Sequence, residues 1–266
     1  MTSYAVVIPH FPANACFREI AETVHYGLLA LGHDSVLSAT TEHEKRRVIA
    51  FGWQLLDPAA KLAADTILYS LEQVGTPQTE AFSLLKKHSV WDYADHNVAL
   101  WRQRGVNATH VPIGYVAELT RIRIDPEPRI DVVFYGALSE RRTRTIRMLE
   151  RAGLKVCAFE GLYGAARDDI IAQSKVVLNL SFHDRHRVFE IVRVSYALAN
   201  ATCVVSEGGH GDAPFREAAV IVDYDELVGA CVAMVRDDAR RAAQAKRGFE
   251  IMRSMPETEV LRRVLS

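Results

Sequence analysis

The sequence has few cysteines and little net charge. Its four cysteines are scattered, with no CxxC pair and no Cys/His spacing suited to zinc. This usage predicts reduced, mostly buried thiols in a cytoplasmic protein. The formal net charge is only −1, whereas a dedicated nucleic-acid-binding protein usually carries a clear basic excess. The composition therefore argues against a nucleic-acid partner.

Long apolar runs, repeats and low-complexity tracts are also missing. The first residues, MTSYAVVIPHF, have neither the basic region nor the long apolar stretch of a signal peptide. No uninterrupted apolar stretch approaches the roughly 20 residues that a membrane helix needs. We expect no transmembrane segment, while peripheral contact with a membrane surface and the oligomeric state stay open.

What the sequence does have is length and apolar content. Its 266 residues are 49% hydrophobic, which suits one large or two small α/β domains. Short apolar runs alternate with helical patterns, and this alternation predicts parallel, doubly wound sheets. In the first half the expected strands are 4–8, 36–39, 48–55, 66–71, 89–91 and 108–112, and the expected helices are 16–31, 80–87 and 97–104.

A charged stretch with two prolines, IRIDPEPR at 122–129, separates the halves and reads as a linker. We expect Rossmann-like domains at 1–121 and 130–255, and a last helix within 256–266 that can cross back to the first domain. Two such domains imply a cleft between them, where ligands often bind. The second half is expected to hold strands 130–135, 155–159, 176–180, 203–205 and 219–222, and helices 141–152, 168–174, 189–199, 225–235, 239–252 and 257–264.

Polar residues follow two consecutive strands of the second half. Asn179 lies near the end of one apolar run, and Glu207 and Gly208 end the next. In open α/β sheets, ligands sit beyond the carboxyl ends of the strands. Glu190 and Arg193 are three residues apart and share one helix face. The carboxylate can accept both ribose hydroxyls, although an intrahelical ion pair explains the same spacing.

The segment YGALSERR, 135–142, follows the first strand of the second half. Gly136 lets backbone N–H groups approach an anion, and the next helix adds its dipole. Arg141 and Arg142 can clamp a diphosphate with their planar guanidinium groups. The alternative is a plain turn with a solvated basic helix start. No GxGxxG is present, so a dinucleotide site is not supported.

The next turn, Glu160–Gly164, contains two glycines and a tyrosine. Gly161 and Tyr163 can flank a nucleobase at this edge of the sheet. A tight loop that needs special backbone angles is an equally good explanation.

The first half offers candidate acid–base groups at the ends of its strands. His10 lies beyond the first strand, between two prolines, and can act as a general base toward a hydroxyl group. Asn14 lies at the same place. Glu72 and Gln73 close one strand and Asp92 closes the next. For His10, a capping or packing role is the alternative.

These segments resemble a known family. FYGALSERR, VVLNLS followed by VFEIVRVSYALANATCVVSE, and VDYDELVGACVAMVRDD resemble the donor-binding domain of GT-B glycosyltransferases, as in bacterial families 1 and 4. ILYSLEQ, VWDYADHN and VPIGY resemble a shortened acceptor domain of the same superfamily. The resemblance covers most of the chain.

The resemblance implies transfer of a sugar from a nucleoside-diphosphate sugar to a hydroxyl acceptor, such as a glycan or a small metabolite, as in polysaccharide biosynthesis. Gly136, Arg141 and Arg142 would hold the diphosphate, and Glu190 and Glu207 the ribose or sugar. No convincing DxD is present, which fits the metal-independent class without a permanently bound cofactor. A sugar-nucleotide epimerase and a non-catalytic nucleotide-sugar or glycan-binding protein are the alternatives.

The chain departs from the family pattern at two places. Tyr196 stands where the second glutamate of E-x7-E would fall, and Asn200-Ala201 replaces a glycine-containing turn. The donor identity, the acceptor and the stereochemical outcome cannot be deduced from the sequence.

Overall fold

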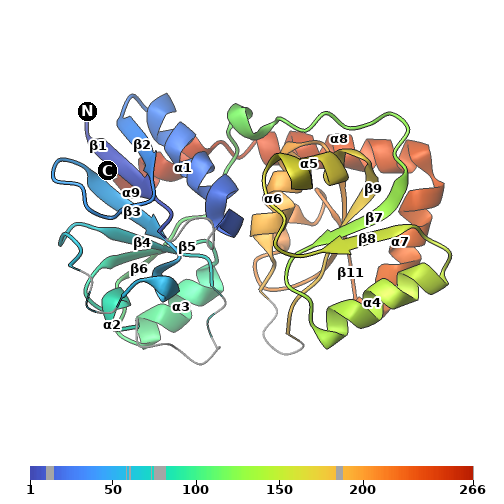
Figure 1. Cartoon of the computed structure of the whole chain (residues 1–266), viewed down its shortest axis with the longest axis horizontal. Helices are drawn as coiled ribbons and strands as arrows, with labels where there is room; N and C mark the ends of the chain where they lie inside the picture. Colours follow the sequence, from blue (N-terminus) through green and yellow to red (C-terminus); the bar gives the residue numbers. More distant parts are fainter. Residues whose placement is uncertain are drawn as a thin grey trace. The chain divides into compact units, whose positions relative to one another are not determined.

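The chain forms two compact units in a computed structural model (Figure 1). Unit 1 combines Met1–Val116 with Met255–Ser266, and unit 2 is Ala117–Ser254. The stretch 122–129, expected to be a linker, is grouped with unit 2. The structure describes residues 1–9, 15–57, 59, 61–72, 74, 82–183 and 188–265.

Unit 1 is built on a six-stranded sheet in which every neighbouring pair is parallel. The strand order is β2-β1-β3-β4-β5-β6, so the direction of winding reverses between β1 and β3. Such a reversal is the topological switch point at which ligands bind in open α/β sheets. The strands are β1 Ser3–Val7, β2 Asp34–Ser38, β3 Arg47–Phe51, β4 Ile67–Ser70, β5 Ser89–Asp92 and β6 Ala108–His110.

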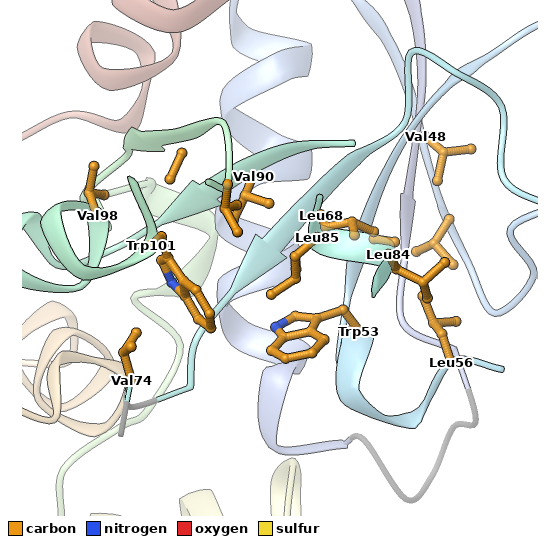
Figure 2. Close-up of a cluster of buried hydrophobic side chains, with 14 of the residues drawn as sticks. Val48, Trp53, Leu56, Leu68, Val74, Leu84, Leu85, Val90, Val98 and Trp101 are labelled. Carbon is orange, nitrogen blue, oxygen red and sulfur yellow. The ribbon is translucent and has the colours of Figure 1, made fainter. Parts of the chain in front are cut away.

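One face of this sheet packs on α2 (Phe82–Leu85) and α3 (Asp95–Gln103), as Figure 2 shows. Alternate strand residues such as Leu68 and Val90 meet Trp101 of α3 there, because successive side chains of a strand point to opposite faces. All three tryptophans of the chain lie in unit 1 and are buried.

The C-terminal helix α9, Glu257–Leu265, packs on α1, Arg18–Ala30. Its first residue is fully buried, and Glu257 Oε2 accepts a hydrogen bond of 2.7 Å from the Gly114 N–H. Glycines allow this contact, since a Cβ on Gly114 would lie 2.7 Å from the Glu257 backbone and one on Gly27 would lie 2.7 Å from its Cγ. Burial raises the pKa of Glu257 to about 8.

The strand predicted over 48–55 was wrong beyond its fourth residue, Phe51. β3 ends at Phe51, because Gly52 adopts a left-handed conformation with φ 65°. The chain then turns into a short 3-10 helix, Trp53–Leu55. This turn places Trp53 and Gln54 at the carboxyl edge of the sheet.

Unit 2 has a five-stranded parallel sheet in the order β11-β10-β9-β7-β8. Its winding reverses between β7 and β9, which places a second topological switch point there. The strands are β7 Ile130–Tyr135, β8 Val156–Phe159, β9 Ser174–Asn179, β10 Cys203–Glu207 and β11 Val220–Val222.

Helices cover both faces of this sheet. Val176 and Leu178 join a cluster with residues of α4 and α7, whereas the buried Val177 between them points to the opposite face. The helices α5 and α6 also contact β9 or β10, as does α8, whose Ala245 packs against the same cluster. The bounds are α4 Glu140–Arg151, α5 Ala165–Ala172, α6 Ile191–Ala199, α7 Leu227–Arg236 and α8 Asp238–Arg253.

The turn after α6 contains Asn200-Ala201, where the family pattern has a glycine-containing turn. Asn200 Oδ1 accepts from the N–H groups of Arg121 (2.8 Å) and Ile122 (2.7 Å), and its Nδ2 donates to Leu119 O (2.9 Å). Asn200 thus fixes the entry of the chain into unit 2. The left-handed conformation falls on Ala201, with φ 52°, where a glycine would be unstrained.

Candidate functional site

Five charged side chains gather at the carboxyl edge of the unit 2 sheet, beside the switch point between β7 and β9. They are called here the arginine–glutamate cluster: Arg141, Arg142, Glu190, Arg193 and Glu207. They come from the start of α4, the start of α6 and the end of β10. The parallel sheet therefore brings together residues up to 66 positions apart.

Arg142 is the central cation of the cluster and is only 3% exposed. Its Nε and Nη2 donate to Leu180 O (3.0 and 2.6 Å), and Nη1 donates to Ala137 O (2.8 Å). Nη2 also meets Glu190 Oε1 at 2.5 Å. Burial lowers the pKa of Arg142 to about 10, so it stays charged at neutral pH. Its guanidinium joins the β7 turn to the loop after β9.

Arg193 lies against the glycine turn. Its Nε donates to Tyr135 O (2.8 Å) and its Nη1 to Asn179 Oδ1 (2.6 Å). Glu190 Oε2 is 3.3 Å from the same Nη1. An ideal Cβ on Gly136 would lie 2.6 Å from Arg193 Nη2, and Gly136 has φ 137°. Glycine is therefore needed here for both backbone angle and space.

Arg141 and Glu207 form a bidentate pair, with Nη1 to Oε2 at 2.7 Å and Nη2 to Oε1 at 2.5 Å. The Ser181 N–H donates to the same carboxylate at 3.3 Å, and the guanidinium stacks 3.9 Å from the Tyr224 ring centre. The Glu207 side chain is 1% exposed, whereas that of Glu190 is 20% exposed. Of the two glutamates, Glu190 presents more surface to a ligand.

Loops at the same edge carry the other predicted donor residues. Gly161 has φ 73° and Tyr163 is 39% exposed, both after β8. Glu160 Oε2 accepts from the Leu138 N–H at 3.1 Å, which ties this loop to the β7 turn. Gly208 follows β10 and its N–H donates to Val222 O at 3.4 Å.

In unit 1, Asp92 has no exposed surface. Its carboxylate accepts from the Ala94 N–H (3.0 Å), Asn97 Nδ2 (3.1 Å) and Trp101 Nε1 (2.8 Å). These bonds fasten the start of α3 to β5. Burial raises the pKa of Asp92 to about 7.

Glu72 lies after β4 and is only partly buried. Its Oε1 accepts from Gln54 Nε2 at 2.7 Å, and its backbone oxygen accepts from Asn97 Nδ2 at 3.1 Å. Burial raises the pKa of Glu72 as well. The candidates His10, Asn14 and Gln73 lie outside the described residues.

Two searches of the described part of the chain are negative. No group of three or more histidine, cysteine, aspartate or glutamate side chains is placed to hold a metal ion there. None of the helices found there has the length and apolar character to span a bilayer.

Solved structures with the same architecture cover nearly the whole chain. HepE of Anabaena, in complex with UDP and glucose, matches with a TM-score of 0.63 at 11% identity, over 100% of this chain and 98% of HepE. T4 phage BGT, in complex with its UDP-glucose substrate, matches with a TM-score of 0.62 at 12% identity, over 99% and 98%. The chain has the GT-B fold. AviGT4, a glycosyltransferase involved in avilamycin A biosynthesis, matches this GT-B chain with a TM-score of 0.59 at 14% identity, over 98% and 96%.

The relatives found by sequence similarity to this GT-B chain are uncharacterized proteins. Two uncharacterized proteins of Acanthamoeba polyphaga mimivirus are 29% and 26% identical over 61% and 62% of this chain. The matches span 56% and 60% of those relatives, so the chain corresponds to little more than half of their length. No family model matches the sequence.

The predicted donor residues of this GT-B chain all lie at the end of, or after, β7, β8, β9 or β10. Tyr224 and the Leu180 carbonyl were missed, because their place in the cluster depends on strand order and backbone geometry. Glu160 was named only as part of its turn. The only sequence feature that could have pointed to Tyr224 is that this aromatic residue comes shortly after β11.

Proposed function

We propose that the protein is a glycosyltransferase that moves a sugar from a nucleoside-diphosphate sugar to a hydroxyl acceptor. The arginine–glutamate cluster at the unit 2 switch point is the observation that carries this proposal. Three arginines outnumber two glutamates there, in a fold shared with proteins solved with UDP-glucose or UDP and glucose. A diphosphate needs fixed positive charge, and a sugar or ribose needs hydrogen-bond acceptors.

Arg193 is our choice for the diphosphate contact. Arg141 and Arg142 are engaged by their own acceptors, whereas Nη2 of Arg193 has no hydrogen-bond acceptor among the described residues and faces the Gly136 turn. The backbone at the start of α4 adds N–H groups and the helix dipole. Glu190 would accept ribose or sugar hydroxyls, since it is the more exposed carboxylate of the cluster.

The chemistry follows from this arrangement. As the bond between the sugar and the diphosphate breaks, negative charge grows on the leaving phosphate, and fixed guanidinium groups lower the barrier electrostatically. The buried arginines support a metal-independent reaction. Glu72 is our choice for the base that takes the acceptor proton, because Asp92 has no exposed surface. Burial raises the pKa of Glu72, which makes its carboxylate a stronger base.

The first test is thermal unfolding with UDP, GDP, ADP, TDP and CMP and their sugars. A ligand at 100 times its dissociation constant stabilises by about 2.7 kcal/mol. We expect one nucleotide to raise the melting temperature, Arg193→Lys to remove most of the rise, and the exposed Arg147→Lys on α4 to retain it. No rise with any nucleotide would contradict the donor site.

Transfer itself is tested with radiolabelled donor and a glycan panel, with and without EDTA. Glu72→Gln should bind donor normally and lose transfer. Binding without transfer or hydrolysis in the native protein would support the binding-protein alternative. Loss of activity in EDTA would contradict metal independence.

A further inference from the structure

Tyr196, which stands where the family pattern has its second glutamate, is bound to charged residues of α5. It is 3% exposed, and its hydroxyl donates to Asp168 Oδ2 at 2.7 Å. Burial raises the pKa of this hydroxyl, so it stays protonated at neutral pH. The other carboxylate oxygen, Asp168 Oδ1, accepts from Arg167 Nη2 at 2.7 Å and from Arg167 Nε at 3.1 Å. Asp168 therefore ties Tyr196 on α6 to Arg167 on α5.

Arg167 is buried, with 4% exposure, and lies over two tyrosine rings. Its Cζ is 4.5 Å from the ring centre of Tyr196 and 5.7 Å from that of Tyr135. A guanidinium within about 6 Å of a ring centre is attracted to the ring, and more strongly where water is excluded. A buried ion pair seldom adds stability over apolar side chains of similar volume. The position of Arg167 therefore points to a role beyond stability.

Tyr135 connects Arg167 to Arg193, the arginine chosen above for the diphosphate. Arg193 Cζ is 5.6 Å from the Tyr135 ring centre, and Arg193 Nε donates to Tyr135 O at 2.8 Å. The Tyr135 hydroxyl in turn donates to Arg193 O at 3.4 Å. Arg193 and Tyr196 are three residues apart on α6 and share one face of it. Tyr196, Arg167, Tyr135 and Arg193 thus form a closed group, called here the arginine–tyrosine stack.

We propose that Arg167 and Tyr135 are positioning residues for Arg193, and that Tyr196 holds Arg167 in place through Asp168. A long side chain that must be ordered on binding lowers the affinity for its ligand, and contacts that order it beforehand remove this cost. A guanidinium already in place also need not reorganise as charge grows on the leaving phosphate. This inference rests on the proposed function, which it deepens by naming the residues that prepare the diphosphate contact.

The test compares the affinity of the full chain for a nucleoside diphosphate with its affinity for the corresponding monophosphate. The probes are UDP, GDP, ADP and TDP with their monophosphates, measured by isothermal titration calorimetry. Arg167→Met should lower the ratio of the two affinities about tenfold, the size of a desolvated cation–aromatic contact. Arg241→Met is the matched control, since Arg241 is a partly buried unit 2 arginine paired with Asp238, and it should leave the ratio unchanged. A merely structural role would change both affinities alike.

A double-mutant cycle shows whether Arg167 acts through Arg193. In an Arg193→Lys background, Arg167→Met should leave the ratio of affinities unchanged, because the contact that it prepares is already lost. Tyr135→Phe keeps the ring and should retain most of the ratio, whereas Tyr135→Leu should lower it about tenfold. Circular dichroism checks that each variant is folded, and the two Tyr135 variants decide the matter if Arg167→Met does not fold.

The outcomes separate this inference from the proposed function. Diphosphate binding by the native protein with an unchanged ratio in Arg167→Met and Tyr135→Leu overturns the inference and leaves the donor site intact. An equal loss from Arg167→Met with and without Arg193→Lys overturns it too, because Arg167 would then act independently of Arg193. Failure of the native protein to bind any of the nucleotides overturns the proposed function and this inference with it.

Discussion

The carboxyl edges of the two sheets treat polar groups in opposite ways. In unit 2, buried arginines and glutamates bond to one another and to the backbone, so the charged groups are fixed without a ligand. In unit 1, six buried side-chain atoms of the described residues have no hydrogen-bond partner, among them Trp53 Nε1, Gln54 Oε1 and Asn97 Oδ1. The charged groups of unit 2 are thus paired with one another, whereas unit 1 leaves buried polar atoms unpaired.

This difference indicates which step of the proposed reaction each unit would serve. Stabilising a leaving diphosphate requires charges that do not reorganise during the reaction.

The largest effect on the free energy of unfolding is expected when the ion pair between Arg141 and Glu207 in unit 2 is removed. Glu207→Ala leaves the buried Arg141 without its carboxylate, and breaking a buried pair costs about 3–5 kcal/mol. Urea unfolding followed by circular dichroism should show this loss in unit 2, while tryptophan fluorescence, which reports unit 1, shifts less. Glu259→Ala removes an exposed pair with Arg262 and should cost less than about 1 kcal/mol. Equal losses in the two variants would contradict the buried pair.

The next effect concerns pH and unit 1. Burial raises the pKa of Glu257 to about 8 and that of Asp92 to about 7. Both acids therefore lose their protons at a lower pH in the unfolded chain than in the folded protein. The free energy of unfolding should therefore fall as pH rises from about 4.5 through 8, by up to about 1.4 kcal/mol per pH unit for each group. Glu257→Gln should flatten the upper part of this dependence. Fluorescence-detected urea unfolding at several pH values tests it, and an unchanged slope in the variant would contradict the assignment.

A smaller effect is expected at the glycine turn. Gly136→Ala forces φ 137° on a residue with a side chain and presses a Cβ against Arg193 Nη2, at a cost of about 1–3 kcal/mol. Nucleotide stabilisation should weaken at the same time. Gly229→Ala, inside α7 with open space around it, should instead gain about 0.5–1 kcal/mol. Normal nucleotide binding by Gly136→Ala would remove this turn from the site.

The smallest effect separates stability from binding. Ala201→Gly relieves a left-handed residue and should raise the free energy of unfolding of unit 2 by up to about 1 kcal/mol. Nucleotide affinity should not change, because the turn after α6 lies apart from the arginine–glutamate cluster in the hydrogen-bond network. Chemical denaturation alongside nucleotide titration tests both statements. A changed affinity would show that this turn influences the site.

Much of the fold could be predicted because buried strands are short and apolar. Ile130–Tyr135 was predicted with the observed bounds, and the helix expected over 141–152 is α4, shifted by one residue. The strand prediction over 48–55 was wrong after Phe51. Apolar residues after Gly52 continue the hydrophobic pattern of the strand, whereas the backbone turns at Gly52. Hydrophobicity alone does not reveal a left-handed glycine.

The site was less predictable, since it depends on strand order. Gly136, Glu190 and Arg193 stood out by residue type and position. That Arg142 would bond to Leu180 O, or Asn179 to Arg193, follows from β7 and β9 being neighbours, which residue spacing does not encode. The roles of all these residues in donor binding stay predictions.

The docking of α9 has a consequence for synthesis of the protein. Unit 2 is continuous in sequence, whereas unit 1 needs Glu257 to fill the space beside Gly27 and Gly114. The ribosome makes all of unit 2 before it reaches that residue. At about 5–20 residues per second, the nascent strands of unit 1 wait on the order of ten seconds for their last helix. Unit 1 begins before unit 2 in the sequence and therefore completes its core after it.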